Sequence, residues 1–229
     1  MHIIWYITQM GQGTSSDRPI KYDKLVHLTY SSIDRVPSKV FEGIRRFASG
    51  YDVRFYDDTH CLRFLEDHFT PVHAQRFREL KSGAHKADLF RYCVLYVHGG
   101  IYMDIKTVLT RHLDEVFDRT YNYTCTSPFT HIYNGIMATE KRNPVIRACI
   151  QRMIVVDKGE FNRDYGINCM ELFRQLRAHN ITVRHGPSGD WFFLQETCLP
   201  GIDRYNMNCT IVDHRQRIMF RTRYDDFPW

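Results

Sequence analysis

Residues 82–106, SGAHKADLFRYCVLYVHGGIYMDIK, join a helix pattern to a strand pattern. Ser82 is a common helix N-cap residue, and the apolar residues after it recur at the spacing of a buried helix face. Gly99-Gly100 predict a sharp end to this helix, and Ile101 to Ile105 then form a short apolar strand. A helix that passes directly into a strand predicts an α/β architecture.

The polar side chains of the predicted helix share one face. Asp88 and Arg91 are three residues apart, next to Lys86, and so project together toward the end of the following strand. A carboxylate and a guanidinium can hold sugar hydroxyls by charge-assisted hydrogen bonds. A surface ion pair is the commoner explanation of this spacing when the helix is taken alone.

The predicted strand carries three polar residues at alternate positions. Tyr102, Asp104 and Lys106 are therefore expected to point to the same side. A ring, a carboxylate that can accept from a ribose hydroxyl or hold a metal, and a cation for phosphate suit a nucleotide diphosphate. A polar strand end that meets solvent is the alternative.

The rest of the chain continues the alternation of strands and helices. It predicts an α/β fold with a Rossmann-like, mostly parallel central sheet flanked by helices on both faces. The chain shows no interdomain linker, so we expect one domain over residues 1–229, with an N-terminal segment and loop over 1–24. Strand patterns cover 25–29, 51–55, 121–126 and 132–138, with short ones near 211 and 218, and helix patterns cover 37–48, 59–69, 71–80, 144–156 and 165–179.

Composition and charge describe an ordinary folded protein. A hydrophobic share of 43% and a charged share of 25% exclude disordered, collagen-like and coiled-coil classes. The net charge of +5 comes from basic residues spread along the chain, which suits a small acidic ligand such as a sugar nucleotide. No stretch reaches the ~18 apolar residues of a membrane span.

The cysteines are odd in number and lack metal-binding spacing. The chain has seven and no CxxC pair, which indicates neither a disulfide framework nor a zinc site. The N-terminal residues show no basic leader or cleavage site. Together these features predict a reducing, cytoplasmic compartment.

The segment 82–106 resembles the central motif of glycosyltransferase family 32, KADxxRYxxLYxxGGxYxDxD. The resemblance implies a type-A glycosyltransferase fold and a hexosyltransferase of carbohydrate biosynthesis. Such an enzyme would move a sugar from a UDP- or GDP-sugar to a glycan or other hydroxyl acceptor, with retention of anomeric configuration. Residues 25–110 would form the donor-binding half and 111–229 the acceptor-side half. The matching positions are Lys86, Ala87, Asp88, Arg91, Tyr92, Leu95, Tyr96, Gly99, Gly100, Tyr102 and Asp104.

The same resemblance implies roles for individual residues. Asp88 and Arg91 would hold the donor sugar beside Lys86, and Tyr102 and Asp104 the ribose and diphosphate. The nucleotide would lie along the first strand, at His27, Leu28 and Thr29. The transferred sugar would lie near Asn134 and Gly135, on the acceptor side.

Lys106 departs from the family pattern, which has a second aspartate there. Like charges within ~4 Å repel by about 4 kcal/mol at an effective dielectric near 20, so Lys106 and a metal ion exclude each other from one position. In one hypothesis Lys106 itself stabilises the departing diphosphate. In the other, which we favour at this point, Mn²⁺ or Mg²⁺ is held by Asp104, the diphosphate and one of Asp213, His214 or Asp225.

Two rival functions stay open. Lys106 also fits a catalytically weak or inactive protein that binds a nucleotide sugar without transferring it. The basic residues near the C-terminus, with their aromatic neighbours, fit a nucleic-acid-binding module, although a solvated strand face is the commoner explanation. These residues are Arg215, Arg217, Arg221 and Arg223 with Phe220, Tyr224 and Trp229.

Overall fold

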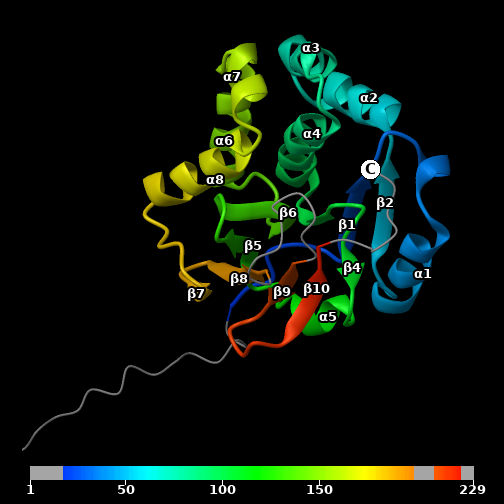
Figure 1. The fold of residues 1–229 in the computed structure, drawn as a ribbon, viewed down its shortest axis with the longest axis vertical. Coiled ribbons are helices and arrows are strands. Elements are labelled where there is room, and N and C mark those ends of the chain that lie inside the picture. Colours follow the sequence, from blue (N-terminus) through cyan, green and yellow to red (C-terminus); the bar gives the residue numbers. More distant parts are fainter. Residues whose placement is uncertain (1–17, 199–208, 223–229) are drawn as a thin grey trace, which may run out of the picture.

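The computed structural model describes residues 18–198 and 209–222, in which ten strands form one sheet (Figure 1). The strand order is β2-β1-β3-β6-β5-β8-β9-β10-β4, and β7 pairs with β8. The strands are β1 Leu25–Thr29, β2 Asp52–Tyr56, β3 Gly100–Met103, β4 Val108–Leu109, β5 Asn122–Ser127, β6 His131–Thr139, β7 Gly186–Ser188, β8 Trp191–Thr197, β9 Thr210–Val212 and β10 Ile218–Arg221. The helices are α1 Ser38–Phe47, α2 Asp58–His68, α3 Pro71–Glu79, α4 Gly83–His98, α5 Leu113–Val116, α6 Pro144–Val155, α7 Lys158–Arg163 and α8 Ile167–Ala178, with a short 3-10 helix at Ile33–Arg35.

Helices cover both faces of the sheet, as Figure 1 shows. Strand β3 supplies both cores because successive side chains of a strand point to opposite faces. Tyr102 belongs to the apolar cluster under α2, α3, α4, α6 and α8. Ile101 and Met103 belong to the cluster on the other face, which contains Val40 of α1 and Leu113 of α5. The fold is therefore the predicted α/β class with a central sheet between helical layers.

The sheet is mixed, and the expectation of a mostly parallel sheet is wrong. Strand β1 is parallel to β2 and β3, and β5 is parallel to β8. The pairs β3–β6, β5–β6, β7–β8, β8–β9, β9–β10 and β10–β4 are antiparallel. Short connections such as the one from Ser127 to His131 can join only antiparallel neighbours, since a parallel pair needs a long crossover.

Most predicted elements have the expected type and nearly the expected bounds. The strand expected to reach residue 105 ends at Met103, so Asp104, Ile105 and Lys106 lie in a turn closed by the Thr107 amide donating to the Asp104 carbonyl at 2.8 Å. Lys106 is therefore not on the strand. The sequence patterns missed β4, α5, α7 and β7, all of which are short. No helix in 18–198 or 209–222 combines the length and apolar character needed to cross a membrane.

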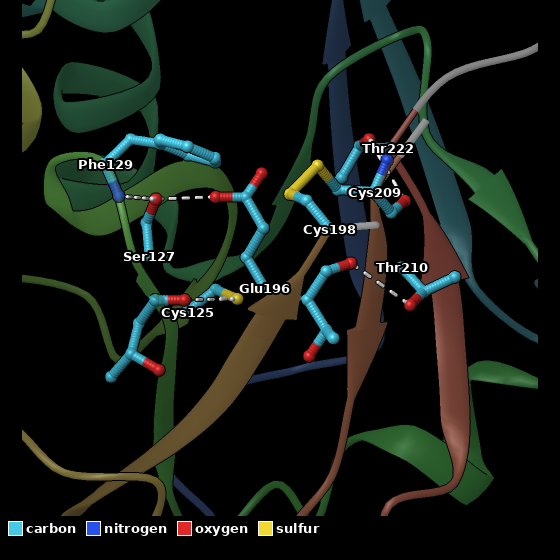
Figure 2. The surroundings of a disulfide bond; sticks show 10 residues. Cys125, Ser127, Phe129, Glu196, Cys198, Cys209, Thr210 and Thr222 are labelled. Carbon is cyan, nitrogen blue, oxygen red and sulfur yellow. Dashed lines mark hydrogen bonds between the residues drawn. A yellow bond between two sulfur atoms is a disulfide. The ribbon is translucent and has the colours of Figure 1, made fainter. Parts of the chain in front are cut away.

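One pair of cysteines forms a disulfide, contrary to the sequence expectation. Cys198 follows β8 and Cys209 precedes β9, and these antiparallel neighbours place Thr197 opposite Thr210 (Figure 2). The two Cα atoms are consequently 4.4 Å apart and the sulfurs are bonded. The spacing of the cysteines in the sequence did not predict this disulfide, because the pairing of β8 with β9 brings the two cysteines together. Cysteine usage therefore does not support the predicted reducing compartment.

The double glycine between α4 and β3 allows close backbone contacts. Gly99 has φ +66° and Gly100 has φ +95°, a region that residues with a side chain rarely adopt. A Cβ atom on Gly100 would lie 2.7 Å from the carbonyl oxygen of Leu25 in the neighbouring strand. Both constraints require glycine where helix α4 turns into β3, the strand that leads to Asp104.

We predict that Gly100→Ala destabilises the protein more than Gly83→Ala does. Gly83 lies in the first turn of α4, and a Cβ there would meet nothing within 4 Å. The strained φ alone should cost Gly100→Ala about 1–3 kcal/mol, and the contact with Leu25 adds to this loss. Urea unfolding measures both variants, and equal stability of the two would contradict the prediction.

Candidate active site

Two adjoining cavities open at one edge of the sheet. The first has a volume of about 440 Å³ and is lined by residues between Thr29 and Lys106 together with Tyr165. The second has a volume of about 500 Å³ and draws most of its lining from residues between Ser127 and Thr222. The cavities share the lining residues Ala84, Arg91, Asp104, Lys106 and Tyr165. The motif around α4 and β3 thus forms the wall between them.

Strand direction brings these residues to a common edge. Strands β1, β3, β5 and β8 run in one direction, so their carboxyl ends at Thr29, Asp104, Ser127 and Glu196 meet there. Strand β6 runs the opposite way and contributes residues near its beginning, including Asn134. The carboxyl ends of strands are the usual ligand site in such folds.

Arg91 is the centre of the shared wall. Its Nη2 lies 2.9 Å from Asp104 Oδ1 and 3.3 Å from Asp88 Oδ1, and its guanidinium lies 4.6 Å from the centre of the Tyr102 ring. Its Nη1 donates to the Asn134 carbonyl at 2.6 Å and to Asn134 Oδ1 at 2.9 Å. Burial opposes the charge, but the neighbouring carboxylates, Asp104 first, raise the pKa of Arg91 well above its ordinary value. The predicted convergence of helix and strand is confirmed.

Asp88 is enclosed by hydrogen-bond donors. Its Oδ1 accepts from Asn134 Nδ2 at 3.0 Å, and its Oδ2 accepts from Asn168 Nδ2 at 2.8 Å. The residue is 7% exposed and lines only the second cavity. Because both carboxylate oxygens are engaged, Asp88 orients Arg91 and Asn134.

Asn134 and Gly135 support the same wall from β6. Asn134 is 4% exposed, and its side chain is occupied by Arg91, Asp88 and Tyr92. The Gly135 carbonyl accepts from the Asp104 amide at 2.7 Å, and a Cβ on Gly135 would lie 2.6 Å from Asp104 Oδ2. Glycine at this position leaves room for the Asp104 carboxylate.

Lysine side chains line the first cavity beside the shared wall. Lys86 Nζ donates to Asp58 Oδ2 at 2.7 Å, and Lys81 and Lys106 line the same space. Of the three residues expected along the first strand, Thr29 lines this cavity. The side chains of His27 and Leu28 are buried in the two cores, and His27 bonds to the Gly99 carbonyl at 3.0 Å. Burial lowers the pKa of His27 to about 3, so it is neutral at physiological pH.

Comparison with known proteins agrees with this geometry. Residues 22–123 match the family described as glycosyltransferase sugar-binding region containing DXD motif. The chain is 26% identical over 186 residues to an uncharacterized glycosyltransferase of Acanthamoeba polyphaga mimivirus, covering 79% of this chain and 72% of that protein. The chain is a glycosyltransferase.

Two yeast relatives are longer than the region they share with this glycosyltransferase. A mannosyl phosphorylinositol ceramide synthase of Saccharomyces cerevisiae is 25% identical over 147 residues, which are 63% of this chain and 38% of the yeast protein. The initiation-specific alpha-1,6-mannosyltransferase of the same yeast is 31% identical over 87 residues, which are 37% of this chain and 18% of that protein.

A solved structure shares the fold. The PaToxG glycosyltransferase superposes with a TM-score of 0.52 at 14% identity, and the match covers 72% of each chain. At this identity the likeness concerns the architecture alone. Together with the mixed sheet between helical layers, it supports the type-A glycosyltransferase fold.

Two of the C-terminal candidates for a metal, Asp213 and His214, do not line either cavity. Asp213 and His214 lie at the closed end of the β9–β10 hairpin, whereas the open end supplies Cys209 and Thr222 to the second cavity. The Asp213 carboxylate accepts from Arg217 Nε at 2.7 Å. Asp225 lies outside the described residues. Asp104 therefore stands apart from Asp213 and His214.

Several residues of this glycosyltransferase site gave no sequence signal. Asn168 of α8 donates the second hydrogen bond to the Asp88 carboxylate. Tyr165 lines both cavities and is 72% exposed. Glu196 is the residue before the last in β8 and lines the second cavity, where Ser127 Oγ donates to its Oε2 at 2.6 Å. Burial raises the pKa of Glu196, an effect that Ser127 and Lys106 oppose. Its place at a carboxyl strand end is the one feature that sequence analysis could have used.

We predict that Asp88→Asn destabilises this glycosyltransferase by about 3–5 kcal/mol, the usual loss when a buried ion pair is broken. The new amide would direct N–H groups toward the donors of Asn134 or Asn168 and remove a charge facing Arg91. Urea unfolding measures the loss.

The control is Asp67→Asn, which affects an exposed pair with Arg63 at 4.0 Å. Such pairs contribute under about 1 kcal/mol, so the control should unfold nearly like the wild type. Equal losses in the two variants would show that the Asp88 cluster is not a structural centre.

Proposed function

We propose that this glycosyltransferase moves a hexose from a nucleotide-diphosphate sugar in the first cavity to a glycan hydroxyl in the second. The observation that carries the proposal is the wall of Arg91, Asp104 and Lys106 that both cavities share. A transferase must bring two substrates together at one bond, and two sites that meet at a charged wall provide this arrangement. In this proposal residues 25–110 form the donor half and the later residues the acceptor half.

The first cavity suits the diphosphate of the donor. Lys81, Lys86 and Lys106 line it, and cations stabilise negative charge that grows on a leaving phosphate. Thr29, at the end of β1, lies where the nucleotide would enter. Asp104 would accept from a hydroxyl of the donor, because its Oδ1 is held in place by Arg91 and by the Tyr102 hydroxyl at 3.3 Å.

The reaction follows from this placement. The acceptor oxygen approaches the anomeric carbon from the second cavity and forms the new bond, while the bond from that carbon to the diphosphate breaks. The departing diphosphate takes the electron pair and receives the acceptor proton. The resemblance to family 32 implies retention of the anomeric configuration, which requires that the acceptor oxygen reach that carbon on the side of the leaving diphosphate, next to the shared wall.

The available ligands favour Lys106 over a metal. DXD glycosyltransferases generally use a divalent metal, which stabilises the leaving diphosphate when bound. Here Asp104 Oδ1 accepts from Arg91, so only Oδ2 of this carboxylate could bind a metal ion. The position of the second aspartate in the DxD motif is occupied by Lys106. Asp88 and Asp58 are already paired with protein groups. The described residues therefore fit a lysine clamp better than a metal clamp.

We predict that Asp104→Asn lowers sugar transfer by about 10²-fold or more while the fold persists. The amide keeps the shape of the side chain but loses the charge that faces Arg91 and the donor. The measurement is hydrolysis and transfer with UDP-, GDP- and CMP-hexoses, after thermal-shift screening for the donor that binds. Asp67→Asn, at an exposed site, is the control.

Full activity of Asp104→Asn would reject the proposed role of Asp104 in sugar transfer. A wild-type protein that binds a donor but neither hydrolyses it nor transfers its sugar to any acceptor would instead be a nucleotide-sugar-binding protein.

We predict that wild-type turnover persists in EDTA and that Lys106→Asp makes turnover depend on Mn²⁺. The variant removes the cation and restores the DxD pattern, so in EDTA it should lose about 10²–10³-fold. Added Mn²⁺ should recover part of that loss. Lys141→Asp makes the same charge change at an exposed position after β6 and should leave turnover metal-independent. Loss of wild-type turnover in EDTA would reject the lysine clamp.

A further inference from the structure

The second cavity contains a carboxylate that the transfer step above does not use. Glu196 lies on β8, which is paired on one side with β5 and on the other with β9. The residue is 9% exposed and nevertheless lines the cavity. A charged group held by paired strands on both sides has a fixed position, which is what a recognition residue requires.

One oxygen of Glu196 has a protein partner and the other is available. Oε2 accepts from Ser127 Oγ, and Ser127 Oγ in turn accepts from the Phe129 amide at 3.2 Å (Figure 2). Figure 2 shows the second carboxylate oxygen directed away from Ser127. Among the described residues no hydrogen bond reaches that oxygen, and its surface is not fully covered. It can therefore accept from a bound molecule.

The two neighbouring cysteines cannot form a metal site with Glu196, and the surroundings of this carboxylate suit a sugar. Glu196, Cys198 and Cys209 lie close enough to hold a metal ion, but the two sulfurs are bonded to each other and offer no thiolate. Phe129 is 44% exposed and lines the same cavity. An exposed ring beside a carboxylate suits a pyranose, which has an apolar C–H face and a rim of hydroxyls.

We propose that Glu196 is an acceptor-binding residue that receives a hydroxyl of a pyranoside acceptor, with the Phe129 ring against the sugar face. This inference rests on the proposed transfer between the two cavities and specifies its acceptor side. Glu196 lines the second cavity and not the first, whereas Thr29, Lys81 and Lys86 line the first and not the second, so its direct contact is with the acceptor.

The disulfide gives the carboxylate its rigid support. Cys198 follows Glu196 by two residues, and its bond to Cys209 fastens the end of β8 to the start of β9 (Figure 2). Glu196 pairs with Ile211 in the ladder between these strands. The side chain is thus held at the cavity by strand pairing, by the disulfide and by Ser127.

The test compares wild type, Glu196→Gln and Glu115→Gln, an exposed control in α5. Protein saturated with the donor that binds is titrated with methyl glycosides of the common hexopyranoses, and transfer rates give the acceptor KM. Loss of a hydrogen bond to a charged group should raise the acceptor KM of Glu196→Gln by about 10- to 100-fold. The donor Kd, measured by calorimetry, should not change.

Ser127→Ala and Phe129→Ala separate recognition from folding. Ser127→Ala keeps the carboxylate but frees it to turn, so its acceptor KM should rise less than that of Glu196→Gln. Phe129→Ala should weaken acceptor binding, and Phe129→Tyr should restore it. If Glu196→Gln does not fold, the acceptor KM values of Ser127→Ala and Phe129→Ala test the site instead.

The outcomes distinguish this inference from the proposed function. Failure of the wild type to bind or hydrolyse any nucleotide sugar would reject the proposed function itself. A wild type that hydrolyses its donor but binds none of the methyl glycosides would reject the pyranoside acceptor. Transfer with the same acceptor KM in wild type and Glu196→Gln would reject the role of Glu196.

Discussion

The buried guanidinium of Arg91 determines the arrangement of the site. Removing a charge from water is costly unless paired groups surround it, and Arg91 meets Asp88, Asp104 and Asn134 at hydrogen-bond distances. These contacts tie helix α4 to the end of β3 and to the start of β6. Two carboxylates face one guanidinium, so the cluster carries an excess negative charge. Asp104, whose side chain is 19% exposed, presents that charge at the cavity surface.

That excess charge explains why a cation belongs beside Asp104. In the usual DxD pattern a metal ion would supply it, and here the side chain of Lys106 comes from the turn directly after Asp104. A lysine in this turn lines both cavities and can approach the diphosphate without a second carboxylate. In the proposed mechanism, Lys106 is therefore the source of the positive charge beside Asp104.

The helices and strands around the first cavity were predicted well from the sequence because their contacts are local. Strand β1 has the predicted bounds, and α4 followed by β3 came from one continuous pattern of apolar spacing and glycines. The wall residues Arg91 and Asp104 are thirteen positions apart and are brought together by a single helix-to-strand turn. Lys106 was placed on the strand in error, since the apolar Ile105 continues the strand pattern although the backbone already turns.

The second cavity could not be predicted in the same way because its contacts are distant in sequence. Asn168 reaches Asp88 across eighty positions, and Glu196 meets Ser127 across sixty-nine. The disulfide also depends on the pairing of β8 with β9, which no local pattern specifies.

The two cavities are built from different parts of the chain, and this has a consequence for the proposed function. The first cavity is built almost wholly from one continuous part of the chain, whereas the second is assembled from β5, β6, α8 and the β8–β10 strands around the same wall. Glu196 and Phe129 line the second cavity and not the first, so substitutions there leave the lining residues of the first cavity in place. In the proposed function, acceptor preference can therefore vary while Arg91, Asp104 and helix α4 keep the point of transfer unchanged.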